Sequence, residues 1–318
     1  MARTATAAAV AGLAAAAAAW FGAGPGTGLR LPASAPGSIL DQPAVVRWEQ
    51  QATDAASVPD AVQRGASSIR IGVVDTGADV STPMLFARRP QTYDVLTRRA
   101  DVRDTYGHGT LVASIAAGAG GDAGLLIVKA ADSSGRISPV SEAAAIRYAV
   151  THGARILNLS FAGPTTSPIE RAAVRFAVKR GALLVAAAGN AYGQGNPVEY
   201  PAALLQPVGS DGRGGSGLAV GASGLDGTRA PFSSSGSWIS LAAPGEQVQG
   251  GNGTSFAAPQ VAGAAALVWA ANPSLSARQV AAILEQTASG HGTWTPDLGY
   301  GVLDVGAAVA AASAAETG

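Results

Sequence analysis

The chain has 318 residues, its 21 Lys and Arg balance its 21 Asp and Glu, and it contains no cysteine. The balanced charge argues against nucleic acid or an anionic membrane as a partner, and the lack of cysteine excludes disulfides, thiolate nucleophiles and iron–sulfur clusters. With 47% hydrophobic and only 13% charged residues, the chain can bury a large core in one or at most two globular domains.

Residues 1–23 predict an export signal. Arg3 precedes an alanine-rich stretch that ends in Trp20 and Phe21, and a run of glycine and proline residues follows. The alternative interpretation is an alanine-rich helix or irregular start that stays with the chain. No other stretch approaches the ~20 uninterrupted apolar residues of a membrane span. We therefore expect a secreted or periplasmic protein whose mature chain has no stable membrane span.

Residues 24–44 are rich in Gly, Pro, Ser and Ala and predict a linker or a short processed segment. A globular pattern begins near Val45, and we expect one domain over residues 45–314. In this domain, aliphatic runs at 69–74, 125–128, 156–159 and 183–187 alternate with helical stretches at 110–117, 141–150 and 169–178. Strands that are apolar on both faces and alternate with helices predict an α/β fold with a covered parallel sheet.

Capping sequences mark two helix starts. Ser167 is followed by Pro168 and Glu170, which combines an N-cap, a proline at the first helical position and a capping-box partner. Ser276 and Gln279 repeat the capping box. The alanine-rich stretch 305–315 predicts a further packing helix.

Two polar sites follow in chain order. Asp75 ends an apolar strand and precedes Thr76-Gly77, so it is expected at the carboxyl edge of the sheet, where catalytic groups gather in open parallel sheets. A plain turn aspartate is the alternative. His108 lies between two glycines and opens an apolar helix, unlike His152 at a helix end and His291 in a loop.

Two more sites lie further along. Asn190 ends the strand 183–187 and its following turn, where its side-chain amide could donate a hydrogen bond to an oxyanion. Ser255 precedes a long apolar helix, where backbone N–H groups favour developing negative charge. Each residue alone has a structural explanation, but an acid, a base and a nucleophile on separate elements of one domain indicate nucleophilic catalysis.

These segments resemble those of the subtilisin-like serine peptidases, the subtilases, and follow that family's order of Asp, His and Ser. The resemblance runs from about Val45 to Ala311 and includes the segments 158–164, 200–202, 231–236 and 242–245. It implies a three-layer α/β/α fold with a mostly parallel central sheet. It also implies a serine endopeptidase that hydrolyses polypeptide substrates through an acyl-enzyme intermediate.

The resemblance also implies a role for each matching residue. Ser255 corresponds to the nucleophile, His108 to its general base, Asp75 to the acid that orients His108, and Asn190 to the side chain of the oxyanion hole. The substrate would pair with the backbone of Ser160, Phe161 and Ala162, while Ala187, Ala188 and Gly189 would wall the pocket for the residue before the cleaved bond.

The chain departs from the family pattern at two places. Many subtilases have a calcium-binding loop where this chain has only Gly118–Gly124, and a further calcium ligand where it has Thr82-Pro83-Met84-Leu85. Calcium does not accept a thioether, so we predict no cofactor and no strong calcium site here, while weak calcium sites stay open. The roughly 20 residues between the expected signal and the domain are too few for a packed pro-domain.

Three alternatives compete with this interpretation. Asp75-Thr76-Gly77 is also the aspartic-peptidase tripeptide, but that chemistry needs a second carboxylate and an all-β fold. The glycine-rich stretch 118–124 follows a helix, whereas a dinucleotide loop must follow a strand. A subtilase fold that binds peptides without cleaving them would lack a triad or oxyanion residue, and none is missing in this sequence.

Overall fold

The computed structural model describes residues 29–30, 48–212 and 214–315. The expected export signal at 1–23, nearly all of the expected linker at 24–44, and Val45 lie outside these residues. Within the linker segment, Leu29–Arg30 form strand β1, which pairs antiparallel with β5 (Arg136–Ile137).

A single parallel sheet of seven strands organises the described residues, in the order β3-β4-β2-β6-β7-β8-β9. The strands are β2 (Arg70–Asp75), β3 (Gln91–Asp94), β4 (Gly124–Lys129), β6 (Ile156–Leu159), β7 (Leu183–Ala187), β8 (Leu218–Ser223) and β9 (Leu241–Pro244). Every residue of β6 and β7 is buried, because helices cover both faces of the sheet.

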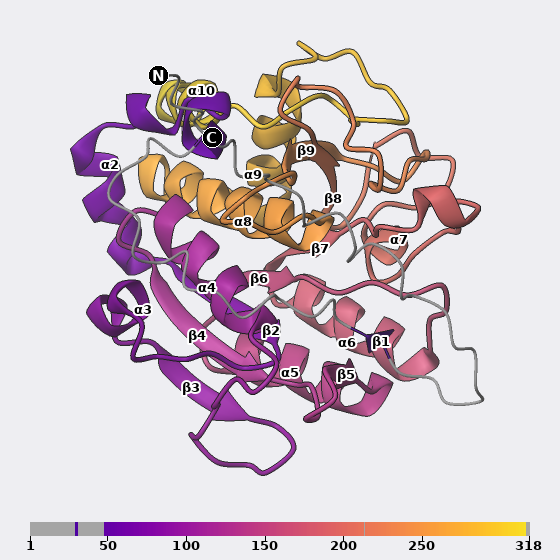
Figure 1. The fold of residues 1–318 in the computed structure, drawn as a ribbon. Coiled ribbons are helices and arrows are strands. Elements are labelled where there is room, and N and C mark those ends of the chain that lie inside the picture. Colours follow the sequence, from indigo (N-terminus) through magenta and orange to yellow (C-terminus); the bar gives the residue numbers. More distant parts are fainter. Residues whose placement is uncertain (1–28, 31–47, 213, 316–318) are drawn as a thin grey trace, which may run out of the picture.

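Helices form a layer on each side of this sheet, so the predicted three-layer α/β/α fold is confirmed (Figure 1). One face packs against α5 (Pro139–Thr151) and α6 (Pro168–Lys179), and the other against α4 (His108–Ala119) and α8 (Thr254–Ala271). The remaining helices are α1 (Trp48–Ala52), α2 (Asp60–Gly65), α3 (Pro83–Arg88), α7 (Ala202–Leu205), α9 (Ala277–Thr287) and α10 (Val305–Ala314). None of the helices in the described part of the chain is long and apolar enough to cross a membrane.

The predicted helix starts are confirmed. At α6, Glu170 N–H donates to Ser167 Oγ (3.2 Å), and Ser167 N–H donates back to Glu170 Oε2 (3.1 Å). Ser276 and Gln279 form the same box at α9. The structure adds a third box at α5 from Ser138 and Ser141, in which a serine takes the place of the expected Glu or Gln.

The first turn of α5 contains a buried acid, Glu142, with only 1% of its surface exposed. Its Oε1 atom has no hydrogen-bond partner among the described residues. Burial raises the pKa of Glu142 well above its usual range, and the charge of nearby Glu170 adds to the effect. The folded chain therefore retains a proton that the unfolded chain releases.

This retained proton predicts a pH-dependent effect of Glu142→Gln on stability. Above the unfolded pKa, about 4.5, the wild type loses stability as pH rises, because its folded state binds more protons than its unfolded state. Glutamine does not titrate, so the free energy of unfolding of the variant minus that of the wild type should increase from pH 5 to pH 9. Denaturant unfolding at both pH values measures it, with Glu246→Gln as control. A difference that does not change with pH would contradict the assignment.

Candidate active site

The predicted site residues lie at the ends of four elements that meet at one edge of the sheet. Asp75 is the last residue of β2, His108 is the first of α4, and Ser255 is the second of α8. Asn190 follows β7 after a short turn. Because parallel strands end at a common edge, this topology brings residues distant in sequence to one place.

Asp75 and His108 form a buried hydrogen bond. His108 Nδ1 lies 2.8 Å from Asp75 Oδ1, and both side chains have 0% exposed surface. The same oxygen accepts the backbone N–H of Thr76 at 2.7 Å. A carboxylate only accepts hydrogen bonds, so Nδ1 is the donor, and in the neutral imidazole this leaves the lone pair on Nε2. The imidazole is thereby held in the tautomer that a general base requires.

Ser255 lies in the same buried region as His108. The His108 ring is 5.9 Å, centroid to centroid, from the ring of Phe256, the residue next to Ser255. Ser255 Oγ and His108 Nε2 are both buried, and neither has a hydrogen-bond partner among the described residues. Among the described residues, the hydrogen bond between Asp75 and His108 is therefore formed, and none joins His108 Nε2 to Ser255 Oγ.

Contacts with Thr254 orient the amide of Asn190. Asn190 Oδ1 accepts the backbone N–H of Thr254 at 2.9 Å and its hydroxyl at 3.1 Å. A Cβ placed on Gly253 would lie 3.4 Å from Asn190 Nδ2 and 3.0 Å from Ser255 Oγ. The amide donor and the hydroxyl therefore flank the same glycine. The N–H of Ser255 lies in the first turn of α8, where a helix offers no internal acceptor.

The segment predicted to bind substrate is connected directly to Ser255. Ser160 Oγ donates to the backbone carbonyl of Ser255 at 2.9 Å and accepts from Asn158 Nδ2 at 2.8 Å. Phe161 and Ala162 follow, and the side chain of Phe161 packs into the core beside α5 and α6. Across the site, Ala187 ends β7, Ala188 is fully buried, and Gly189 N–H donates to Thr254 Oγ1 at 3.2 Å.

Asp104 is a site residue that the motifs did not reveal. Its two carboxylate oxygens accept five hydrogen bonds, from Thr76 Oγ1, from the N–H groups of Tyr106, Gly107 and Thr110, and from Thr110 Oγ1. Burial opposes ionisation, but these hydrogen bonds outweigh it and lower the pKa of Asp104. Thr76 Oγ1 also accepts the N–H of Gly109 at 2.8 Å. Asp104 therefore ties the end of β2 to the start of α4.

Glu199 is a second residue that the sequence did not single out. It is 3% exposed, and its Oε2 accepts a hydrogen bond from Ser234 Oγ at 2.7 Å. Burial raises the pKa of Glu199 to about 7, against the opposing hydrogen bonds from Ser234 and from the backbone of Ala191.

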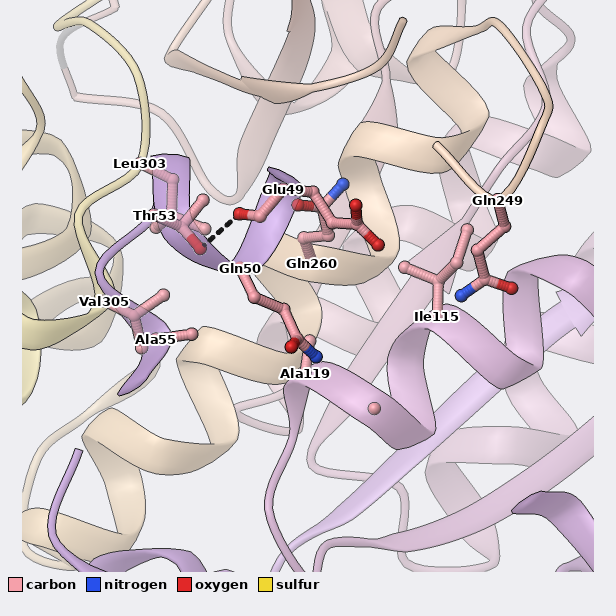
Figure 2. Close-up of a pocket in the computed structure, with 11 residues that line it drawn as sticks. Glu49, Gln50, Thr53, Ala55, Ile115, Ala119, Gln249, Gln260, Leu303 and Val305 are labelled. Atoms are coloured by element: carbon pink, nitrogen blue, oxygen red, sulfur yellow. Dashed lines mark hydrogen bonds between the residues drawn. The ribbon is translucent and has the colours of Figure 1, made fainter. Parts of the chain in front are cut away.

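A separate hollow lies between α1, α4 and α8 (Figure 2). Its lining includes Gln50, Ile115 and Gln260 and none of the predicted site residues. Gln260 Nε2 donates to the carbonyls of Pro244 (2.7 Å) and Phe256 (2.8 Å), so both of its N–H groups already have acceptors within the protein. This hollow is therefore distinct from the site around Ser255.

Comparison with known proteins agrees with the fold. The sequence model of the subtilase family, peptidase S8, matches residues 66–301. This match covers well over half of the chain, and the chain belongs to the subtilase family.

Curated relatives and solved structures narrow the class. An alkaline protease of Alkalihalobacillus alcalophilus is 37% identical over 271 residues, which cover 79% of this chain and 67% of the relative. Subtilisin Savinase of Lederbergia lenta is 36% identical over 271 residues, 79% of this chain and 94% of the relative. The MycP3 protease from the type VII (ESX-3) secretion system superposes with a TM-score of 0.68 at 26% identity, over 87% of this chain and 90% of that structure. A cold adapted subtilisin-like serine proteinase superposes with a TM-score of 0.64 at 26% identity, over 76% of this chain and 90% of that structure. The chain is thus a subtilisin-like serine endopeptidase.

The position of Asp104 predicts that Asp104→Asn slows catalysis. Losing an acceptor should shift the start of α4, and with it the imidazole, relative to Ser255. We expect kcat to fall on the order of 10- to 100-fold, because small displacements of reacting groups have effects of that size. Steady-state kinetics with a chromogenic peptide, alongside the melting temperature, measure the effect. Asp101→Asn is the matched control, since Asp101 is exposed and its carboxylate accepts from Arg103 N–H (3.1 Å). An unchanged kcat in the folded Asp104 variant would remove this role.

Proposed function

We propose that the chain cleaves peptide bonds through a triad of Asp75, His108 and Ser255. Ser255 Oγ attacks the peptide carbonyl and gives its proton to His108 Nε2, and His108 then donates that proton to the leaving amine. Water, activated by the same imidazole, hydrolyses the resulting acyl-enzyme. The buried 2.8 Å hydrogen bond between Asp75 and His108 is the observation that supports this proposal most directly. Asp75 orients the ring and stabilises the imidazolium that forms in each step.

The same proposal assigns the oxyanion hole to Asn190 Nδ2 and the backbone N–H of Ser255. Thr254 occupies Asn190 Oδ1, which leaves the Nδ2 donor for the developing negative charge. The start of an 18-residue helix, α8, adds the favourable end of a helix dipole. Both donors are fixed before substrate binds, which is the condition for strong electrostatic stabilisation of a transition state.

Substrate binding is proposed to use backbone pairing. Beyond the end of β6, Phe161 and Ala162 take part in no backbone hydrogen bond outside regular elements among the described residues. Their N–H and carbonyl groups, with those of Ser160, can pair with an extended polypeptide as an added strand. Ala187, Ala188 and Gly189 would wall the pocket for the residue before the cleaved bond. Pairing through the main chain implies broad tolerance of sequence outside that pocket.

We further propose that the chain is exported and acts without a cofactor or a nucleic-acid partner. The chain has 21 basic and 21 acidic residues, and this balance supports the absence of a nucleic-acid partner. The residues at the expected calcium position do not fit the ion. Thr82 precedes α3, Met84 is partly buried against the core, and Leu85 is fully buried, so the segment offers few hard oxygen ligands. No catalytic step is routed through calcium.

A fluorophosphonate probe separates this enzyme from a peptide-binding protein on the same fold. We expect one covalent adduct per chain, located at Ser255 by peptide mapping and absent in Ser255→Ala, because only an activated hydroxyl displaces the fluoride. Thr254→Ser, which keeps the neighbouring hydroxyl, serves as the control and should still label. Peptide binding without any labelling of the wild type would instead support the non-catalytic alternative.

Asn190→Ala tests the oxyanion hole. Loss of the corresponding amide in subtilisin lowers turnover by ~10²- to 10³-fold, and we expect the same order here, mainly in kcat. KM should change little, because the donor acts on charge that appears only in the transition state. Asn196→Ala, which removes contacts with Ser235 outside the proposed hole, is the comparison variant. Equal kcat values for Asn190→Ala and the wild type would exclude the role.

A further inference from the structure

Glu199 lies where the two walls of the proposed substrate pocket meet. On one side, a Cβ added to Gly189 would overlap Glu199 Oε2, so the carboxylate packs directly against this glycine. Gly189 has φ of +110°, which favours glycine, and it immediately precedes Asn190. The carboxylate is therefore adjacent to the wall formed by Ala187, Ala188 and Gly189.

The other wall reaches Glu199 through its neighbour in sequence. Tyr200 and Gly163 exchange backbone hydrogen bonds, with Gly163 N–H donating at 3.0 Å and Tyr200 N–H donating at 2.8 Å. Gly163 directly follows Ala162, the last residue of the segment proposed to bind substrate. Glu199 is thus next to both walls at once, and it is buried, with 3% of its surface exposed.

The carboxylate at this position has hydrogen bonds but no cation. Ser234 Oγ and the N–H of Ala191 donate to it, and Ser234 N–H is itself held by the carbonyl of Gly189 at 3.0 Å. None of the ion pairs within the described residues includes Glu199. A buried carboxylate without a cation is costly, and its pKa of about 7 reflects that cost. Neither the wall of Ala187, Ala188 and Gly189 nor the segment Ser160, Phe161 and Ala162 contains a charged side chain.

We propose that Glu199 forms the charged floor of the pocket and selects substrates with lysine or arginine before the cleaved bond. This inference rests on the proposed function, because it needs the pocket that the triad serves. The aliphatic stem of the substrate residue passes between the small walls, and its cationic end pairs with the carboxylate. An acidic residue is repelled there, and a bulky aromatic ring meets a floor already occupied by the carboxyl group.

Matched substrates test the charge preference. Two chromogenic peptides differ only in the residue before the cleaved bond, which is lysine in one and norleucine, its uncharged analogue of similar length, in the other. At pH 8 the wild type should cleave the lysine peptide with at least about tenfold higher kcat/KM. In Glu199→Gln this ratio should fall roughly 10- to 100-fold, the size expected when one partly buried charge pair is lost, while kcat/KM for the norleucine peptide stays within about threefold.

Glu285→Gln provides the matched control. Burial also raises the pKa of Glu285, to about 8, but Glu285 belongs to α9 and contacts Gln206 rather than the proposed pocket. Its variant should keep the wild-type ratio of lysine to norleucine cleavage. If the ratio of lysine to norleucine cleavage is equal in the wild type and in Glu199→Gln, the inference is overturned. It is also overturned if the wild type cleaves a matched peptide with alanine before the cleaved bond and cleaves neither the lysine nor the norleucine peptide.

A measurement on the wild type keeps the test decisive if Glu199→Gln does not fold. Protonated n-butylamine resembles the end of a lysine side chain, and n-butanol is its neutral counterpart. The amine should inhibit peptide cleavage competitively at a concentration at least about tenfold lower than the alcohol, and equal inhibition contradicts a charged floor. Labelling of Ser255 by fluorophosphonate separates the two levels of failure. If labelling persists without a charge preference, only the role of Glu199 fails, whereas loss of both labelling and cleavage defeats the proposed function itself.

Discussion

The hydrogen bond between Asp75 and His108 is the constraint on which the rest of the site depends. Neither side chain is exposed, so the hydrogen bond between them replaces hydrogen bonds that water would otherwise make. Asp75 has two donors, the imidazole and the N–H of Thr76, and these fix the carboxylate at the end of β2. The imidazole can then serve a hydroxyl only on its other side. A change that separates β2 from α4 would therefore move the imidazole of His108 away from Asp75.

The packing of α4 against α8 fixes where Ser255, at the start of α8, lies relative to His108, at the start of α4. A Cβ on Gly263 would lie 2.6 Å from Ala119, so only a glycine lets the two helices approach this closely. Alanines dominate the contact on both helices, which gives a short distance between the helix axes and little freedom to adjust. The alanines of α4 and α8 thus serve close packing of the two helices.

The sequence predicts the centre of the molecule better than its edges. Strands β6 and β7 are predictable because both faces are buried, so that β7 is entirely aliphatic and β6 is interrupted only by Asn158. Edge strand β3, Gln91–Asp94, was not predicted, because it is polar and pairs on one side only. The residues of the site also differ in how well the sequence predicts them. Residues within glycine-bracketed motifs were identified, while Asp104 and Glu199 were missed, since each acts through partners that only folding brings near.

Two of the buried acids illustrate why position within the fold, and not burial alone, points to function. Glu170 lies in the first turn of the 12-residue helix α6, where the capping box gives its carboxyl group a structural role, although burial still raises its pKa. Glu199 precedes α7, a helix of only four residues that supplies little dipole, and it is held instead by a serine and a loop N–H. Glutamine could accept the same hydrogen bonds at lower desolvation cost. The acid at 199 is therefore difficult to explain by folding, whereas a cation entering between the two walls gives it the partner that the chain itself does not provide.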